Sequence, residues 1–214
     1  MGIDIVHPRI EAYLRELLGG EHEIATEMEE AAEGFPIVGR IVGVTLEVLA
    51  RAVGARRVLE LGSGFGYSAF WFARAVGSGG EVHMTDTDPD KQARAVDYLG
   101  RAGRGDRVRS HVGEALDVFD QVDGEFDVIF NDIDKTGYPE AWRRARQRIR
   151  PGGLYLCDNV LWSGRVVEGV EDEGQEEITG AVVEHNRAVA GDDGYRSTIV
   201  PTRDGVMVAV RLSG

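Results

Sequence analysis

The stretch that most constrains the fold runs from Val58 to Ser68. It begins with an apolar run too short for a helix and continues into three glycines at alternate positions, Gly62, Gly64 and Gly66. A helical pattern of apolar residues opens directly afterwards, at Ser68. This order predicts a strand, a tight turn and a helix, in which bare glycine backbone lets a ligand approach the helix N-terminus. We expect the loop to hold a nucleoside.

Two acids accompany the glycine loop. The strand expected next ends in Asp86, about 20 residues after the loop, where a carboxylate accepts hydrogen bonds from both ribose hydroxyls. Glu60 stands two residues before the first glycine, a spacing that resembles the S-adenosylmethionine loop of Rossmann-like methyltransferases. The resemblance implies a ligand with a cationic end near Glu60, whereas a pyrophosphate would be repelled. A turn that merely packs a helix against a strand is the alternative for the glycine pattern alone.

From Arg57 onward, strand patterns alternate with helical patterns, which predicts a parallel sheet. The turn sequence from Thr202 to Gly205 is a hairpin signal, so the last strand is expected to lie antiparallel. The predicted fold class is α/β, a Rossmann-like, mostly parallel seven-stranded sheet with helices on both faces. The expected strands are Arg57–Leu61, Glu81–Asp86, Val108–Val112, Phe126–Asn131, Gly153–Asp158, Tyr195–Pro201 and Gly205–Arg211.

The 214 residues suit one domain, with helices over residues 1–55 covering a core of residues 56–214. Packing explains most apolar positions of these helices, but the break at Phe35 and Pro36 could line a pocket or a dimer contact. The N-terminus resembles no signal peptide and no apolar run reaches membrane-spanning length, which predicts a cytoplasmic protein without membrane contact. The single cysteine, Cys157, is expected to be a buried hydrophobe.

Charge excludes one class of partner. The chain has 24 basic and 37 acidic residues, a net charge of −13, and no basic patch, so nucleic acid is not expected to bind. Only Lys91 and Lys135 are lysines. An acidic, lysine-poor surface fits a high-salt cytoplasm, although a GC-rich genome would also replace lysine codons with arginine codons.

The carboxyl ends of the expected strands carry a cluster of oxygen donors. Asp132 follows the fourth expected strand, and Asp158 and Asn159 lie at the end of the fifth. In an open α/β sheet the carboxyl ends of neighbouring parallel strands meet at one edge. The set contains no sulfur or imidazole and suits a hard cation such as Mg²⁺, with Ca²⁺ or Mn²⁺ as alternatives. Any one of these acids alone would be explained as a helix cap or a solvated side chain.

Two segments resemble those of a known family. Residues Phe130–Tyr138 (FNDIDKTGY) and Asp158–Gly164 (DNVLWSG) are similar to the metal-binding segments of cation-dependent O-methyltransferases, the caffeoyl-CoA and catechol O-methyltransferase family. The resemblance covers about residues 28–212. Asn131 and Ile133 depart from the family pattern, where an aliphatic residue and alanine are usual, and both could reshape the acceptor pocket.

The resemblance implies a role for each matching residue. It places S-adenosylmethionine on Glu60, Gly62, Ser63, Gly64, Gly66, Ser68, Asp86, Ala115 and Asp132, the metal on Asp132, Asp158 and Asn159, and catalysis on Lys135. The expected reaction is methyl transfer from S-adenosylmethionine to a hydroxyl of a small catechol-like acceptor. The resemblance also implies a homodimer.

Several alternatives stay open at this point. Trp162 and Tyr138 could wall the acceptor ring or belong to the core, and the acidic stretch 168–177 could be a lid or a solvated loop. A nicotinamide-dependent oxidoreductase would use a similar glycine loop but would leave the Asp132 and Asp158 cluster without a purpose. A methyltransferase-fold protein that binds the cofactor without turnover is the remaining alternative.

Overall fold

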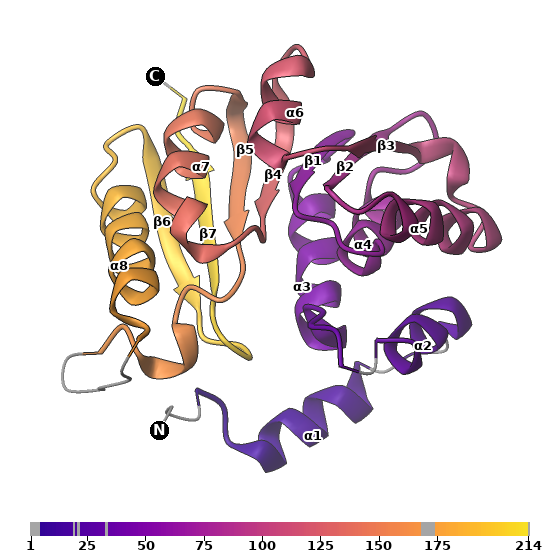
Figure 1. Ribbon diagram of the computed structural model, residues 1–214, viewed down its shortest axis with the longest axis horizontal. Helices are drawn as coiled ribbons and strands as arrows, with labels where there is room; N and C mark the ends of the chain where they lie inside the picture. The colour runs from indigo at the N-terminus through magenta and orange to yellow at the C-terminus, as the bar shows by residue number, and fades with distance from the viewer. Residues whose placement is uncertain (1–4, 19, 21, 33, 168–173, 214) are drawn as a thin grey trace.

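The computed structural model describes residues 5–18, 20, 22–32, 34–167 and 174–213. At its centre lies one seven-stranded sheet in the order β3-β2-β1-β4-β5-β7-β6 (Figure 1). Its strands are β1 Arg57–Leu61, β2 Glu81–Asp86, β3 Val108–Val112, β4 Phe126–Asn131, β5 Ile149–Cys157, β6 Tyr195–Val200 and β7 Val206–Arg211. The strands β1 to β5 pair in parallel, and β7 runs antiparallel to both β5 and β6. The predicted fold class is confirmed.

One strand begins earlier than predicted. β5 starts at Ile149 rather than Gly153, because Ile149 already pairs with Phe126 of β4. The register between β4 and β5 shifts directly afterwards, between Phe126 and Val128, and this irregularity accommodates Pro151 inside the strand.

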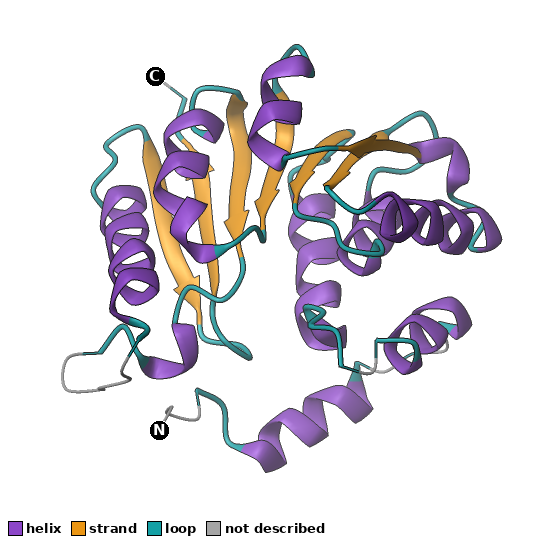
Figure 2. Cartoon of the chain, viewed as in Figure 1, coloured by secondary structure: helices purple, strands orange, loops and turns teal. Residues whose placement is uncertain are grey.

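Helices cover both faces of the sheet (Figure 2). Alternate residues of each strand point to opposite faces, so Val58 packs with α3, α4 and α5 while Leu59 packs with α6, α7 and α8. This arrangement gives two hydrophobic cores separated by the sheet. The helices are α1 Pro8–Leu17, α2 Glu23–Glu30, α3 Gly39–Ala52, α4 Tyr67–Ala75, α5 Pro89–Arg101, α6 Ala115–Gln121, α7 Tyr138–Ala145 and α8 Glu176–Ala190.

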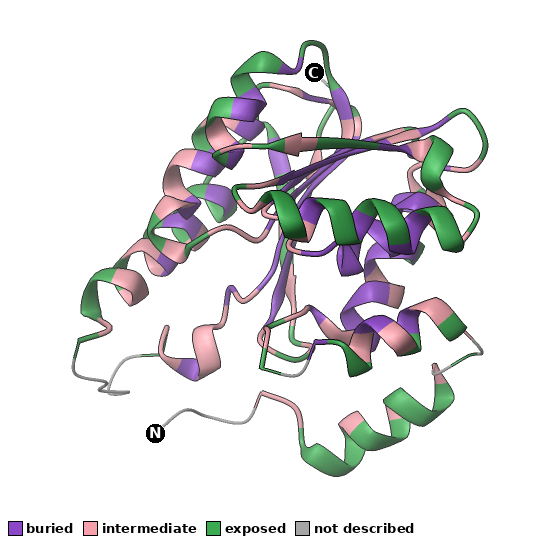
Figure 3. Ribbon diagram, turned by 45° about the vertical axis from the view of Figure 1, so that its right-hand side comes forward, coloured by how far each residue is buried: buried purple, intermediate pink, exposed green. Residues whose placement is uncertain are grey.

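The N-terminal helices differ in what they cover. α2 and α3 bury Met28, Val42 and Leu46 against the core, as expected. Packing was the wrong interpretation for α1, which lies away from the sheet and contributes no buried residue (Figure 3). Its apolar stripe is open: Ile10 is 54% exposed and Tyr13 is 60% exposed. In the part of the chain that is described, no helix is long and apolar enough to cross a membrane.

Candidate active site

The register of three neighbouring strands brings the predicted acids together. Leu61 of β1 pairs with Asn131 of β4, which pairs with Cys157 of β5. The ladder continues one residue further, where the Asp132 N–H donates to the Leu61 carbonyl at 2.9 Å and the Asp158 N–H donates to the Asn131 carbonyl at 3.1 Å. Asp132 and Asp158 therefore leave the sheet side by side at the carboxyl ends of their strands.

The glycine loop between β1 and α4 requires glycine at its two ends. Gly62 has φ of +83°, and a Cβ there would lie 2.6 Å from the Asp132 carbonyl oxygen. Gly66 has φ of +87°, and a Cβ there would lie 2.7 Å from the Ala95 Cβ. Any side chain would push the loop away from β4 or push α4 away from α5. The spacing of Gly62 and Gly66 in the sequence thus has a steric cause in the fold.

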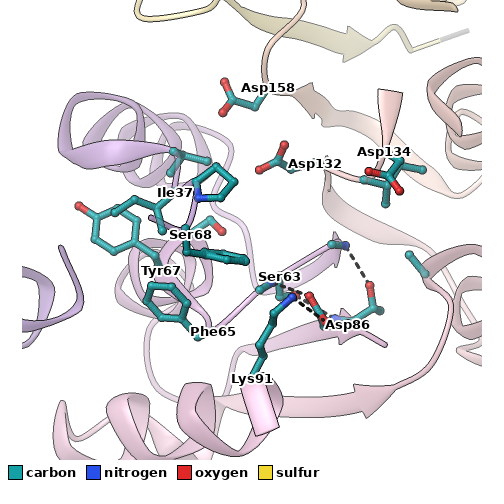
Figure 4. A pocket seen from close by; sticks show the side chains of 18 of the residues that line it. Ile37, Ser63, Phe65, Tyr67, Ser68, Asp86, Lys91, Asp132, Asp134 and Asp158 are labelled. Carbon is teal, nitrogen blue, oxygen red and sulfur yellow. Dashed lines mark hydrogen bonds and ion pairs between the residues drawn. The ribbon is translucent and has the colours of Figure 1, made fainter. Parts of the chain in front are cut away.

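Asp86, at the end of β2, holds the glycine loop in place by a backbone hydrogen bond. Its two carboxylate oxygens accept hydrogen bonds from the Gly64 N–H at 3.1 Å and from the Asp88 N–H at 2.9 Å. The Lys91 ammonium lies 3.9 Å from the same carboxylate (Figure 4). The carboxylate lines the cavity beside the loop, and its ribose role stays a prediction.

Glu60 lies behind the loop and is fully buried. Among the described residues, the hydroxyls of Ser63 and Ser68 are the groups that interact favourably with its carboxylate, and no cation pairs with it. Burial raises the pKa of Glu60 to about 7, opposed by the hydroxyls of Ser68 and Ser63. A buried carboxylate without a cationic partner is costly, so a cationic group of a ligand would stabilise it.

One cavity of about 420 Å³ joins the glycine loop to the strand-end acids (Figure 4). Its volume is within the usual range for small-molecule sites. Most of the residues predicted for the site line it, namely Gly62, Ser63, Gly64, Ser68, Asp86, Ala115, Asp132, Lys135, Asp158 and Asn159. Glu60 and Gly66 support the loop without lining the cavity.

Asp132 and Asp158 form a coupled acidic pair. Burial and the mutual repulsion of the two carboxylates raise the pKa of Asp132, and Lys135 opposes that shift, with its ammonium 3.6 Å from Asp132 Oδ1. Burial also raises the pKa of Asp158, which the Arg203 guanidinium opposes most strongly. Two carboxylates that repel each other in a buried site favour either a proton or a cation between them.

The residues present fit a hard divalent cation. Asp158 Oδ1 is buried and has no hydrogen-bond partner within the described residues, and the neighbouring Asn159 adds an amide oxygen. Oxygen donors of this kind are those that Mg²⁺ and Ca²⁺ prefer. Within the described ranges, no group of three or more His, Cys, Asp or Glu side chains is placed to hold a metal ion, so the candidate set is two carboxylates and one amide.

The segment after β5 is backbone-strained and tightly held. Asn159, Trp162 and Ser163 have φ of 56°, 48° and 52°, although none is glycine. The segment is tied to α8 by the Asn186 amide, which donates to the Val160 carbonyl at 2.7 Å, and to α7 by the Tyr138 hydroxyl, which donates to the Asp158 carbonyl at 2.9 Å. Non-glycine residues with positive φ persist where surrounding contacts enforce them, frequently at functional sites.

The two aromatic candidates for the acceptor wall have different surroundings. Tyr138 is fully buried and belongs to the core, with its hydroxyl committed to Asp158. Trp162 is half-buried beside the core under α8 and is not among the residues that line the cavity. The acidic stretch 168–177, for which a lid and a solvated loop were the alternatives, falls mostly on residues 168–173, outside the described residues.

The cavity also has lining residues outside the predicted set. The segment from Phe35 to Val38 covers the glycine loop, and Lys91 and Arg203 reach in from α5 and from the β6–β7 turn. The break at Phe35 and Pro36 could line a pocket or a dimer contact, and both residues line this cavity. Arg203 carried no sequence signal beyond its place in a hairpin turn.

Comparisons with known proteins agree with this geometry. A family model described as O-methyltransferase matches residues 16–212. The chain is 35% identical to a catechol O-methyltransferase of Niastella koreensis, over 74% of this chain and 76% of the relative. It is 29% identical to caffeoyl-CoA O-methyltransferase 1 of Eucalyptus globulus, over 80% of this chain and 73% of the relative.

Solved structures give the same result. The O-methyltransferase TomG from Streptomyces achromogenes, in complex with S-adenosylmethionine, superposes with a TM-score of 0.86 at 29% identity and covers 96% of both chains. An O-methyltransferase from Bacillus cereus, in complex with S-adenosylhomocysteine, has a TM-score of 0.84 at 28% identity, covering 95% of this chain and 97% of that one.

The fold and the strand-end cavity together define a methyltransferase that uses S-adenosylmethionine. More specifically, the chain belongs to the O-methyltransferase family and is an S-adenosylmethionine-dependent O-methyltransferase. The nicotinamide-dependent oxidoreductase considered from the glycine loop alone is thereby excluded.

Proposed function

We propose that the protein methylates one of two adjacent hydroxyls on a small aromatic acceptor and requires a divalent cation, with Mg²⁺ expected. One observation carries the proposal: Asp132, Asp158, Asn159 and Lys135 line the same cavity as Asp86 and the glycine loop. Donor and acceptor can therefore meet in one cavity. The names of the catechol and caffeoyl-CoA O-methyltransferase relatives support an acceptor with vicinal hydroxyls.

The chain's own residues supply binding and orientation. Glu60 is suited to the cationic amino group of S-adenosylmethionine, because its buried carboxylate has no cationic partner among the described residues. Asp86 is suited to the ribose, since its carboxylate already orders the backbone of the glycine loop. Together they fix the direction of the methyl group, and orientation of reactants is worth several orders of magnitude in rate.

Lys135 is the candidate for handling the acceptor's proton. Its ammonium lies 3.6 Å from Asp132 Oδ1 and faces the rings of Tyr138 and Trp162. An amine that has lost its proton can take one from a hydroxyl, whereas a guanidinium cannot. A divalent cation on Asp132, Asp158 and Asn159 would supply Lewis acidity, which lowers the pKa of a neighbouring hydroxyl.

Removal of metal tests this proposal. Exhaustive chelation should lower methyl transfer to catechol by more than about 100-fold, and added Mg²⁺ should restore it. Asp158→Asn keeps the side-chain shape but removes a charge, so it should weaken Mn²⁺ binding in a spectroscopic titration while S-adenosylhomocysteine still binds. Asp193→Asn makes the same change on an exposed acid away from the cavity and serves as the control.

Two results would contradict the proposal. Full turnover of catechol by protein shown to be metal-free would remove the cation from the reaction. Cofactor binding without methylation of catechol under any metal condition would mean that the acceptor belongs to another chemical class.

A further inference from the structure

Arg203 occupies an unusual position between two cavities. It lies at the turn between β6 and β7 and adopts φ of 50°, which a non-glycine residue seldom does. Its guanidinium Nη1 donates to the Ile37 carbonyl and lies 4.0 Å from Asp158 Oδ2. The side chain lines the active-site cavity and also an adjoining hollow of about 260 Å³. An acceptor that extends from the active-site cavity into this hollow would therefore lie beside Arg203.

The adjoining hollow has an apolar wall and a charged end. Pro36, Ile37, Val38, Ile41 and Val42 provide most of the apolar lining. Arg40 lies at the charged end and is held by Glu29, with Nε 2.8 Å from the carboxylate. An aromatic ring can rest on the apolar wall. Arg203 lines both cavities and lies 4.0 Å from Asp158.

The donors of Arg203 are only partly used. The contacts of its guanidinium with Ile37 and Asp158 both use Nη1, and within the described ranges no carbonyl or carboxylate pairs with Nε or Nη2. These two groups form the edge of a guanidinium that binds a carboxylate through two parallel hydrogen bonds. The side chain is 40% exposed, so a ligand in the cavity can reach that edge.

Electrostatics favour an anion at this edge. Arginine stays charged at any working pH. Asp158 neutralises it in part, but the same carboxylate is in the candidate set for a divalent cation, which would repel the guanidinium. The other nearby carboxylate, Asp204, accepts a hydrogen bond from the Ser163 N–H and is committed to the strained segment. Arg203 would then keep the Ile37 carbonyl but lack an anionic partner unless the acceptor brings one.

We propose that Arg203 selects acceptors that carry a carboxylate on the ring opposite the vicinal hydroxyls, as in the dihydroxybenzoates. This proposal rests on the proposed function, because the hydroxyls must lie toward Asp132, Asp158 and Asn159. The ring then lies along the apolar wall formed by Ile37 and Val38, and the carboxylate meets the Nε and Nη2 edge of Arg203.

Acceptor preference tests the assignment. Three probes differ in charge: 3,4-dihydroxybenzoate, catechol and 3,4-dihydroxyphenethylamine. With Mg²⁺ and S-adenosylmethionine, the parent protein should show a kcat/KM for the benzoate at least about tenfold above that for catechol, and the amine should be the poorest acceptor. Calorimetric titration of the benzoate into protein loaded with Mg²⁺ and S-adenosylhomocysteine gives a binding readout independent of turnover.

Variants of Arg203 separate recognition from folding. Arg203→Asn suits the left-handed backbone, so it removes the cation without disturbing the turn. It should lower kcat/KM for the benzoate by roughly 10-fold to 100-fold more than kcat/KM for catechol, so the preference for the benzoate over catechol should be lost. Arg203→Lys keeps the charge and should restore part of the benzoate preference. Arg196→Gln removes an equal charge from exposed strand β6 and should leave the preference intact.

The possible failures are distinct. Methylation of catechol with no preference for the benzoate would overturn the role of Arg203 and leave the proposed function standing. An equal loss on all three probes in Arg203→Asn, accompanied by weaker Mn²⁺ binding, would show that Arg203 supports Asp158 instead. Absence of catechol and benzoate turnover in the parent protein, with metal and cofactor bound, would overturn both.

Discussion

Lys135 shows how much the choice of one residue type decides at this site. Its ammonium lies beside Asp132 and over two aromatic rings, close to where the acceptor hydroxyl is proposed to lie. Basic residues of this chain are arginine at all positions but two. An arginine here would keep the attraction to Asp132 but could not accept a proton.

Lys135→Arg should therefore lower kcat by roughly 10²–10⁴-fold, the usual scale for loss of a general base. Binding of S-adenosylmethionine and Mn²⁺, measured by calorimetry, should stay close to the parent because the charge is retained. Lys91→Arg makes the same change at the only other lysine and should alter kcat by less than about threefold, whatever its effect on cofactor affinity. A Lys135→Arg variant that also stays within that margin across pH would make Lys135 a charge-pairing residue.

At the scale of elements, two adjacent polar residues of helix α8, His185 and Asn186, join it to β5 and to the strained segment after β5. Asn186 holds the Val160 carbonyl, and the adjacent His185 lies against Tyr155, with Nε2 3.0 Å from the tyrosine hydroxyl. His185 is fully buried, and burial lowers its pKa to about 4, opposed by the hydrogen bond to Asn186. The fold thus holds this imidazole neutral.

Stability should fall in acid because of His185. Its folded pKa is depressed, so its contribution is present above the unfolded pKa of about 6.5 and is lost as pH falls toward the folded value. From about pH 7.5 to about pH 4.5 the loss should be roughly 2–3 kcal/mol. His185→Gln cannot titrate, so its urea-unfolding free energy should change by that much less over the same interval.

His7→Gln removes an imidazole from an exposed position and serves as the matched substitution; the change in pH dependence in His185→Gln should exceed any change that it causes. An unchanged pH dependence in His185→Gln would contradict the assignment. Burial also lowers the pKa of His83 and of His111, but these groups are common to parent and variant and cancel in the comparison.

The apolar face of helix α1 is exposed to solvent. Ile10, Tyr13 and Leu17 are each more than half exposed. The homodimer implied by the family resemblance stays a prediction, and this face is a surface that a second copy could cover. Sedimentation of the parent and of a Tyr13→Glu variant would decide whether α1 takes part.

At the scale of the whole molecule, the outstanding property is the net charge of −13. Many arginines are paired with surface acids, as in Arg101 with Glu27 and Arg144 with Asp120, but acids outnumber bases 37 to 24. Self-repulsion on this scale destabilises a compact state and is relieved by screening. Salt also weakens the individual ion pairs, each of which contributes little.

Relief of repulsion should prevail, so Tm should rise between about 0.05 M and about 1 M KCl. Differential scanning calorimetry on the metal-free protein measures this without interference from cation binding at the active site. Most of the rise should come at low salt, where the Debye length shortens most. A flat or falling Tm would favour genome composition over salt adaptation as the origin of the lysine-poor surface.

The sequence by itself determined the order of the elements and the chemistry at the strand ends. Strand bounds such as Arg57–Leu61 and Phe126–Asn131 were predicted correctly, because the change from a helical to a strand pattern is a local property. Gly62 and Gly66 could be identified because no other residue fits their backbone. Asp132 and Asp158 could be paired because parallel strands end at one edge.

Tertiary structure alone decided what depends on residues distant in the chain. Arg203 reaches Asp158 and Ile37 only because the β6–β7 turn folds back over the end of β5, and no local pattern encodes that approach. The apolar stripe of α1 has the same periodicity as a buried helix, yet its face is exposed. Periodicity specifies which side of a helix is apolar, whereas only the packing of the rest of the chain decides whether that side is covered.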